Sequence, residues 1–222
     1  MLKPVIISSV KLSKAIPAGV TVVAVSKTQP PGKIVEAIDA DFTHFGENRI
    51  EEVEQKWTRL PQTMRRKVTL HMIGHVQSRK AARVVKLCDW VDSVDSLKLA
   101  QKLDTRAAEL HKKLSVLVQV SFSKERNKFG YQPSAQFERE LLAIHKLENI
   151  ALRGLMTIAP LVDDPRKARL TFQKLAQLRK YLSEKYPQLN LAHLSMGMTN
   201  DYQVALEEGA TMVRIGRGIF GA

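Results

Sequence analysis

The sequence has few of the features that mark extracellular or membrane proteins. Its 222 residues include one cysteine, Cys88, so no internal disulfide can form, and a single thiol is typical of a reducing compartment. No apolar run approaches the roughly 18 residues of a membrane-spanning helix. The first ten residues also lack the sustained apolar core and the cleavage site of a signal peptide. We therefore expect a cytoplasmic protein with no membrane partner.

Aromatic residues are scarce as well, at 6%, whereas 44% of the residues are hydrophobic, which is the balance of an aliphatic α/β interior. Short apolar runs alternate with longer amphipathic segments, and this alternation predicts parallel strands joined by helical crossovers. Eight repeats favour a closed (β/α)8 barrel (TIM barrel), and no Gly-x-Gly-x-x-Gly turn follows the first strand, as it would in an open dinucleotide-binding sheet. No linker interrupts the pattern, so we predict a single domain over 1–222. The predicted strands are 20–25, 42–45, 70–73, 90–94, 115–120, 151–156, 191–194 and 212–215; the predicted helices are 31–40, 49–60, 78–87, 96–113, 134–146, 164–185 and 201–208, with Ser96 and Ser134 at helix starts.

Acidic residues are outnumbered by basic ones, 22 against 35, which gives a net charge of +13. A stretch without acidic residues between positions 55 and 88 raises the hypothesis of a nucleic-acid or other anionic partner. Part of it also has the spacing of the solvated face of an amphipathic helix, and no aromatic residue interleaves it as a platform for bases. We therefore expect no nucleic acid and keep this function as a remote alternative. The basic residues of the stretch are Lys56, Arg59, Arg65, Arg66, Lys67, Arg79, Lys80, Arg83 and Lys86.

Lys27 closes an apolar run at the predicted carboxyl end of the first strand. In a barrel of this kind, functional side chains gather at the carboxyl ends of the strands. Desolvation there favours the neutral amine, which is the form that makes a Schiff base with an aldehyde. Position alone also fits a lysine that extends into solvent. The glycine-rich carboxyl-terminal segments favour the first interpretation.

Two of these segments have the composition of a phosphate site. After the seventh predicted strand, Ser195 offers a hydroxyl, Gly197 allows close approach of the backbone, and Thr199 or Asn200 is placed to cap the next helix. After the eighth predicted strand, a second turn begins at Gly216. Loops at these two places often form the phosphate cradle of barrel enzymes.

An aldehyde for Lys27 and a phosphate for the two loops together specify pyridoxal 5′-phosphate as the expected cofactor. Arg214 then faces the pyridine nitrogen. Because an arginine does not accept the proton of that nitrogen, the ring stays a weak electron sink. The expected phosphate ligands are Ser195, Thr199 and the amides near Gly216 and Arg217.

Ordered sequence blocks carry a resemblance to a known family: VAVSK at 23–27, HFGEN at 44–48, HMIGHVQSRK at 71–80, GLM at 154–156, LSMGM at 194–198, MVRIG at 212–216 and IFG at 219–221. Together they resemble the pyridoxal phosphate homeostasis proteins. The resemblance implies one barrel of the alanine-racemase N-terminal domain type (PLP fold type III), with the cofactor as a Schiff base on Lys27. It also implies a role in vitamin B6 homeostasis, buffering or delivering the cofactor to apo-enzymes, without an established reaction. Val76 and Arg79 stand where the family pattern has leucine and asparagine.

The same resemblance implies a set of cofactor-binding residues. Independently of it, we expect a monomeric or weakly associating barrel. Asn48 is expected near the cofactor. The residues expected to line its ring and phosphate are Ser195, Gly197, Thr199, Arg214, Gly216 and Arg217.

An amino-acid racemase on the same barrel is the main alternative. Racemisation needs two bases on opposite faces of the substrate, and Lys27 supplies one of them. The racemases that share this barrel use a tyrosine and an additional β-domain, for which this chain has no length; Tyr131 is the nearest candidate.

No metal site is expected. His71 and His75 are four residues apart, but Met72 stands where a zinc-protease helix has glutamate. Packing or hydrogen bonding at the rim is the expected role of both histidines. Cys88 is expected to be a small core residue.

Overall fold

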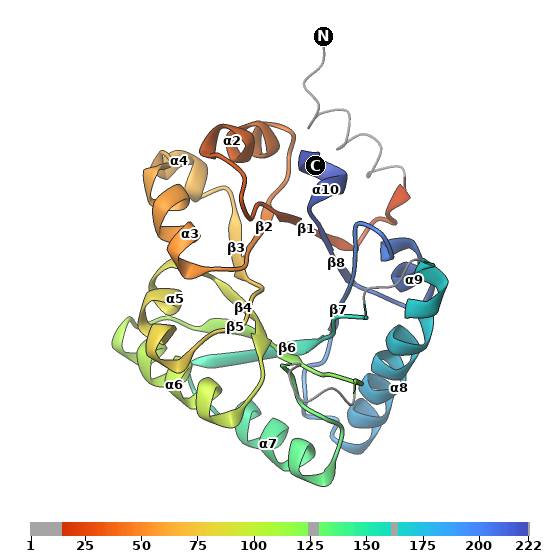
Figure 1. Cartoon of the computed structure of the whole chain (residues 1–222). Helices are drawn as coiled ribbons and strands as arrows, with labels where there is room; N and C mark the ends of the chain where they lie inside the picture. Colours follow the sequence, from red (N-terminus) through yellow and green to blue (C-terminus); the bar gives the residue numbers. More distant parts are fainter. Residues whose placement is uncertain (1–14, 124–128, 161–163, 222) are drawn as a thin grey trace.

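The computed structural model describes residues 15–123, 129–160 and 164–221. In this part of the chain eight parallel strands form a closed barrel in chain order, and β1 pairs with β8 to complete it. Figure 1 shows the strands around a common centre with the helices outside them. The predicted (β/α)8 barrel is confirmed. The strands are β1 (Thr21–Val25), β2 (His44–Glu47), β3 (Thr69–Met72), β4 (Trp90–Val94), β5 (Leu114–Gln119), β6 (Ile150–Met156), β7 (His193–Met198) and β8 (Met212–Ile215).

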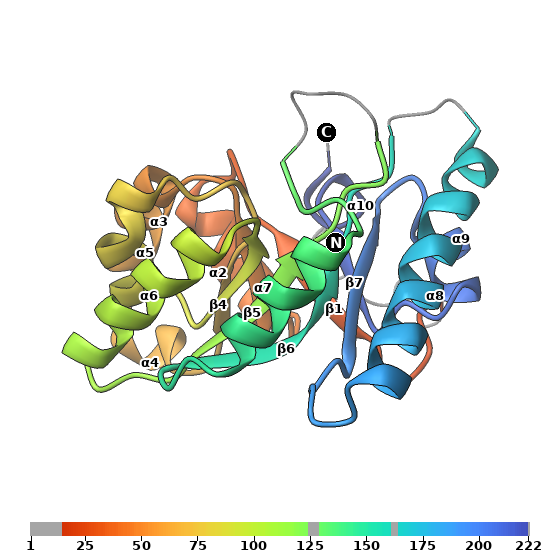
Figure 2. The same ribbon diagram turned by 90° about the horizontal axis from the view of Figure 1, so that it is seen from below.

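The helices cover the outside of the barrel. Figure 2 shows α3, α5 and α6 on one side and α8 and α9 on the opposite side. Ser96 and Ser134 cap helices as predicted, since their hydroxyls accept hydrogen bonds from the Leu99 and Phe137 amides. None of the described helices is long and apolar enough to span a membrane. The helices are α2 (Pro31–Asp39), α3 (Ile50–Lys56), α4 (Gln62–Arg65), α5 (Ala81–Leu87), α6 (Leu97–Glu109), α7 (Ala135–His145), α8 (Arg169–Lys185), α9 (Tyr202–Glu207) and α10 (Arg217–Phe220), with 3-10 turns η1 (Trp57–Arg59), η2 (Ser78–Lys80) and η3 (Pro165–Ala168).

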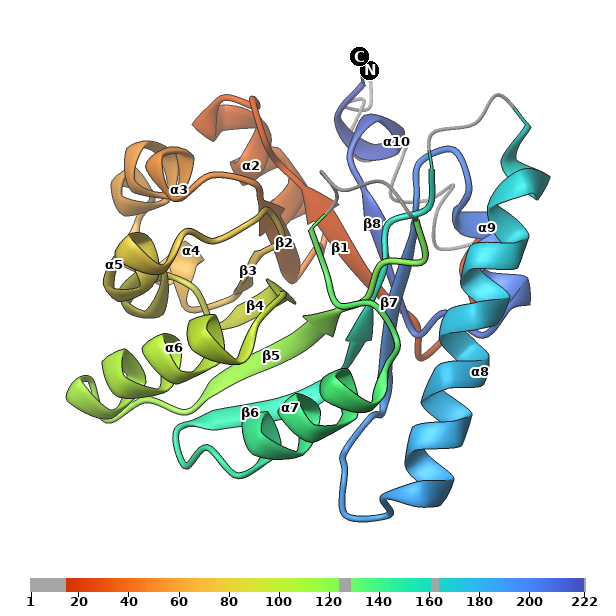
Figure 3. The same ribbon diagram turned by 60° about the horizontal axis from the view of Figure 1, so that its bottom comes forward.

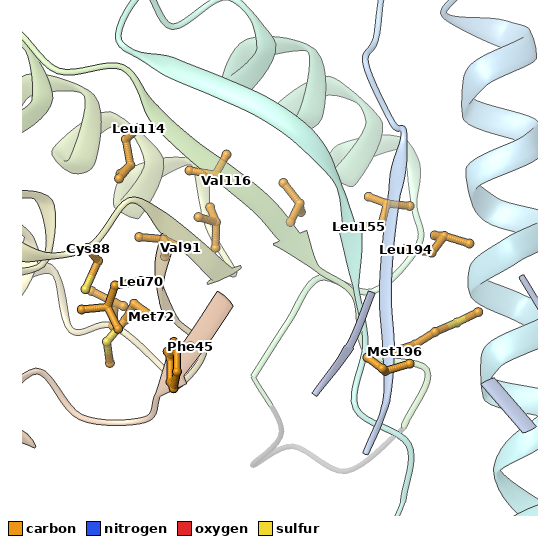
Figure 4. Packing of buried hydrophobic residues seen from close by; sticks show 14 of the residues in the cluster. Phe45, Leu70, Met72, Cys88, Val91, Leu114, Val116, Leu155, Leu194 and Met196 are labelled. Carbon is orange, nitrogen blue, oxygen red and sulfur yellow. The ribbon is translucent and has the colours of Figure 1, made fainter. Parts of the chain in front are cut away.

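The core has two parts because successive strand side chains point to opposite faces. A large cluster fills the space between strands and helices; Figure 4 shows part of it, including Phe45, Met72 and Leu194. A small cluster lies inside the barrel. It joins side chains from β1, β5, β6 and β8, which surround the same interior in a closed barrel. Its members are Val23, Leu117, Met156 and Met212.

Two strands run further toward the carboxyl rim than the sequence predicts. β2 extends to Glu47, and β7 begins at His193 and continues to Met198. Within β7, Gly197 has a φ of +90°, and the pairing with β8 shifts register between Ser195 and Met198. Glycine and an irregular register break the apolar alternation by which a strand is recognised. Ser195 and Gly197 therefore lie inside a strand rather than after it.

The predicted helices differ from the observed ones mainly where the observed segments are short. The predicted helix 49–60 is α3 followed by η1, and the predicted helix 164–185 is η3 followed by α8. The four-residue helices α4 and α10 were not predicted. Figure 3 shows α10 beside the end of β8, where the sequence predicts only a glycine-rich turn. The predicted single domain also includes residues 1–14, 124–128, 161–163 and 222, which lie outside the described part of the chain.

Candidate functional site

A cavity of about 370 Å³ opens among the residues that follow the strands at the carboxyl rim of the barrel. This volume lies in the range of small-molecule sites. Its lining contains residues that are far apart in sequence: they come from β1, β7 and β8 and from the segment directly after β2. Six of the predicted site residues belong to the lining: Lys27, Asn48, Thr199, Arg214, Gly216 and Arg217.

Lys27 lies in the turn after β1, with its side chain exposed at the cavity. The expectation of a desolvated lysine is therefore wrong, since Lys27 is exposed. The reason is that β1 ends at Val25 and Ser26 is the last buried residue, so Lys27 already stands above the packed interior. Pairing of Ala24 with Ile215 places the turn beside Gly216 on the same rim. The amine and the glycine turn thus face one cavity.

Arg214 reaches the cavity from inside the barrel. The residue is 4% exposed; its Nη1 donates to Ser195 Oγ at 2.7 Å and its Nη2 donates to the Thr157 carbonyl at 2.8 Å. Burial lowers the pKa of Arg214, and the charges of Asp92 and Asp201 act in the opposite direction. An arginine remains a cation under these conditions. The site therefore has a fixed guanidinium at its base.

Ser195 and Gly197 do not belong to the cavity lining. Ser195 is fully buried, and its hydroxyl accepts the Arg214 hydrogen bond. Gly197 lies against α9, where a Cβ would come within 2.6 Å of Ala205 Cβ and 2.9 Å of Tyr202 Cα. Gly197 thus allows the close backbone approach that the sequence predicts, but toward a helix. Both residues lie behind the surface formed by the other six.

Polar groups gather around Thr199 at the rim of the cavity. Thr199 Oγ1 accepts from the Gly216 amide at 3.3 Å and from the Gly218 amide at 3.4 Å. Arg217 is exposed, and its Nη2 donates to Asn200 Oδ1 at 3.3 Å. The Thr199 hydroxyl, the Gly216 amide and the Arg217 guanidinium all belong to the cavity lining, and donors of these kinds suit an anion. Together with the amine of Lys27, they fit a ligand that carries both a phosphate and an aldehyde.

The predicted capping of α9 by Thr199 or Asn200 is wrong. The helix begins at Tyr202, and the residue before it is Asp201, whose carboxylate accepts from the Met198 amide at 2.6 Å. The extended β7 moves the helix start past both predicted residues. Thr199 is therefore free of helix capping and bonds to the Gly216 turn instead.

Two residues of the cavity lining, Gln119 and Phe129, were not predicted from the sequence. Gln119, at the end of β5, donates through Nε2 to the Phe129 carbonyl at 3.0 Å. The Phe129 ring stacks on His75 with 3.7 Å between ring centres, and His75 Nδ1 lies 2.9 Å from Asp95 Oδ2. The sequence signal for Gln119 was that it is a glutamine at the carboxyl end of a mostly apolar strand. The pairing of His75 with Phe129 joins segments that no local pattern connects.

His71 and His75 both make the packing and hydrogen-bonding contacts expected of them, but only His75 does so at the rim. His75 lies at the rim, and His71 is fully buried inside the barrel, with Nδ1 2.9 Å from Asp92 Oδ1 and Nε2 3.0 Å from His44 Nδ1. In the described residues no group of three or more His, Cys, Asp or Glu side chains could hold a metal ion. Cys88 is fully buried, and burial raises the pKa of its thiol to about 12, which confirms its role as a core residue.

The basic stretch is partly neutralised. Lys56 is buried against Glu47, and Lys80 pairs with Glu51 at 3.0 Å. Arg83 pairs with Glu54 and with Glu51 across α3 and α5. These pairs use acidic residues that precede the stretch in sequence, which the count of charges along the chain does not reveal.

Comparison with known proteins agrees with this geometry. A family model described as the alanine racemase N-terminal domain matches residues 10–222. An alanine racemase of Clostridium difficile superimposes with a TM-score of 0.80 over all of this chain and 57% of that chain, at 18% identity, and so shares the fold. The fold and the site thus define a barrel of the alanine-racemase type.

Nearer relatives narrow this class. The pyridoxal phosphate homeostasis protein of Vibrio alginolyticus is 43% identical over 208 residues, covering 93% of this chain and 88% of the relative. The structure of PipY of Synechococcus elongatus with PLP bound is 37% identical, with a TM-score of 0.89 over 98% of this chain and 100% of that chain. The chain belongs to the pyridoxal phosphate homeostasis protein family.

Proposed function

We propose that this protein binds pyridoxal 5′-phosphate in the carboxyl-rim cavity as a Schiff base on Lys27 and takes part in intracellular vitamin B6 homeostasis. The observation that carries the proposal is the single cavity in which the Lys27 amine faces the Thr199–Gly216 donor set. The binding of PLP by PipY, a protein of nearly the same fold and length, supports it.

Each cavity residue has a role that follows from its chemistry. Lys27 would hold the cofactor covalently, because its amine can condense with the aldehyde with loss of water. Thr199, the Gly216 amide and Arg217 are placed for the phosphate, and Arg214 supplies a cation to the ring side of the cavity. When bound, the cofactor supplies an imine that a free amine can displace, so its attachment is reversible. Asn48, directly after β2, is a further polar contact in the cavity. Ser195 acts through its hydrogen bond with Arg214, and Gly197 through its packing on α9.

Buffering or delivery is better supported than racemisation. The relatives that match most of the chain are named for homeostasis and not for a reaction. Among the described cavity-lining residues there is no tyrosine. The Tyr131 hydroxyl donates to Glu140 Oε2 at 2.7 Å, and burial together with this bond raises the pKa of Tyr131 far above its ordinary value. Because this phenol keeps its proton, it is not available to accept another from a substrate.

The proposal extends to the setting of the protein. We infer a cytoplasmic, monomeric, single-domain protein that exchanges the cofactor with PLP-dependent apo-enzymes. Imine displacement gives such an exchange a chemical route, because a lysine of a recipient enzyme is itself an amine. Cofactor transfer no faster than release into buffer would contradict the delivery part of this proposal.

Absorption spectroscopy tests the attachment site. Wild-type protein incubated with pyridoxal 5′-phosphate should develop the visible band of a Schiff base, and borohydride should convert it into a permanent modification of Lys27 found by peptide mass spectrometry. Lys27→Ala should lose the band, whereas the control Lys33→Ala should keep it, because Lys33 lies on α2 and pairs with Glu36 outside the cavity. A reducible band that persists in Lys27→Ala would overturn the proposal.

A further inference from the structure

A buried ion cluster lies beneath the turn that carries Lys27. Lys56, the last residue of α3, is 8% exposed, and its Nζ lies 2.8 Å from Oε1 of the fully buried Glu47 and 2.9 Å from Oε2 of Glu52. Trp57 Nε1 donates to the same Glu47 oxygen at 3.1 Å. A buried ammonium is tolerated only when it is paired and hydrogen-bonded. The cluster therefore holds Lys56 in one place.

Hydrogen bonds tie this cluster to the residues on both sides of Lys27. On the amino side, Lys56 Nζ donates to the Ser26 carbonyl at 2.8 Å, and Ser26 Oγ donates to Glu47 Oε1 at 2.7 Å. On the carboxyl side, the Thr28 amide donates to Glu52 Oε2 at 2.7 Å. The backbone of Lys27 is thus fixed from both ends by groups that do not line the cavity.

Thr28 has an unusual conformation that needs this support. Its φ is +63°, in the left-handed region that β-branched residues rarely adopt. A strained residue persists only where its surroundings hold it, and such residues concentrate at functional sites. The Glu52 carboxylate holds the Thr28 amide, and the Thr28 hydroxyl donates to the Lys27 carbonyl at 2.6 Å. The bend at Thr28 sets the direction in which the chain leaves Lys27.

We propose that Lys56, with Glu47 and Glu52, forms a positioning device that holds the 26–28 turn so that the Lys27 amine is presented to the cavity. Core stability alone does not account for the arrangement, because apolar side chains of similar volume fill a core as well as a buried ion pair does. Here all three charged groups converge on the turn that carries one lysine. The inference rests on the proposed attachment of the cofactor to Lys27.

Glu52→Ala is the first test, with Glu51→Ala as its matched control. Both changes remove one acidic residue from the first turn of α3 and introduce the best helix former. Only Glu52 bonds to the Thr28 amide; Glu51 pairs with Lys80 and Arg83. Glu52→Ala should speed amide hydrogen exchange at Thr28 and slow the formation of the covalent adduct by up to about a hundredfold, because a misplacement of about 1 Å in a reacting group has an effect of this size. Glu51→Ala should leave both unchanged.

Lys56→Met is the second test, with Lys80→Met as its control. Both lysines pair with glutamates of α3, but only Lys56 touches the 26–28 turn. In apo protein shown to be folded by circular dichroism, Lys56→Met should slow adduct formation. It should also change the rate at which formaldehyde and cyanoborohydride methylate Lys27, a readout that does not involve the cofactor. Should Lys56→Met fail to fold, the partly exposed Glu52 site still decides the question.

The outcomes separate the two proposals. Wild-type rates of adduct formation and of Thr28 exchange in folded Glu52→Ala would overturn the positioning inference while leaving the attachment of the cofactor intact. Absence of a borohydride-reducible adduct in the wild-type protein would overturn the proposed function instead. Faster Thr28 exchange with an unchanged rate of adduct formation would show a tether without a positioning role and would also overturn the inference.

Discussion

Arg214 and Ser195 show how one buried contact sets the direction of a charged group. The hydroxyl of Ser195 and the carbonyl of Thr157 each accept one hydrogen bond from the guanidinium, on Nη1 and Nη2 respectively. Neither acceptor is charged, so they orient the cation without forming an ion pair with it. The face that Arg214 presents to the cavity is therefore set by two neutral groups.

Ser195→Ala should leave Arg214 with an unsatisfied donor. Loss of a buried hydrogen-bond partner destabilises a protein by about 1–3 kcal/mol. We expect a decrease of this size in the free energy of unfolding, measured by urea denaturation, and weaker retention of pyridoxal 5′-phosphate in dialysis with the covalent adduct still formed.

Ser93→Ala is the control for that change. Ser93 Oγ donates to the Gly74 carbonyl at 2.6 Å, so the variant also loses a buried hydroxyl contact, but one that does not touch Arg214. Equal loss of cofactor retention in the two variants would contradict the role given to Ser195.

At the level of single residues, the sequence predicted which side chains line the cavity better than it predicted which partners surround a buried side chain. Lys27, Thr199 and Arg214 follow from their places after strands or within the last strand, and all three line the cavity. Lys56 was counted only as one cation of the basic stretch. Its pairing with Glu52 follows the i,i+4 spacing of α3, but the buried Glu47 comes from β2, and no local pattern brings that carboxylate to Lys56.

Strand β7 gives the corresponding lesson for an element. Its Ser195, Gly197 and register shift resemble a loop, so the predicted strand stops at 194, four residues early. The other strands are predicted closely where apolar residues dominate, as in β4 and β8, whose predicted and observed bounds coincide. Irregular strands remain hard to predict because their shape depends on the neighbouring strand.

Gly197→Ala tests whether β7 needs a glycine for its left-handed backbone conformation and its close approach to α9. A left-handed conformation costs about 1–2 kcal/mol for an ordinary residue. A Cβ at 2.6 Å from Ala205 Cβ adds overpacking of about 1–3 kcal/mol. We expect thermal unfolding of this variant at a clearly lower temperature, together with weaker binding of the cofactor.

Gly209→Ala is the matched control. Its φ is +85°, close to that of Gly197, but a Cβ there meets nothing within 4 Å. This variant should show the conformational penalty alone. Identical losses of stability at the two positions would show that contact with α9 does not matter.

The interior of the barrel contains a chain of hydrogen-bonded polar groups contributed by β2, β3 and β4. His44, His71 and Asp92 are linked by bonds of 3.0 and 2.9 Å, and Trp90 stacks on His71. Burial, followed by the charge of His71, lowers the pKa of His44 to about 4. Burial also lowers the pKa of His193. Both histidines are thus held neutral by the closed barrel.

This cluster predicts a loss of stability in mild acid. In the unfolded chain His44 takes up a proton near its ordinary pKa of about 6.5, whereas in the folded protein it does so near 4. The unfolded state binds more protons between these values, so the free energy of unfolding falls as the pH is lowered through this window. Above about 6.5 the contribution of His44 to stability is fully present.

Urea denaturation at several pH values measures this effect. His44→Gln keeps hydrogen-bonding capacity toward His71 but does not titrate, so its free energy of unfolding should depend less steeply on pH between 6.5 and 4. A slope equal to that of the wild-type protein would show that the barrel interior does not hold His44 neutral.

Closure of the barrel through β1 and β8 has a consequence for folding. Lys27 is translated early, but Arg214 and Gly216, which lie beside its turn, come from the last strand and the residue after it. Until β8 has paired with β1, the turn of Lys27 therefore lacks Arg214 and Gly216 beside it. The cavity is assembled only at the step of folding in which the first and last strands of the barrel meet.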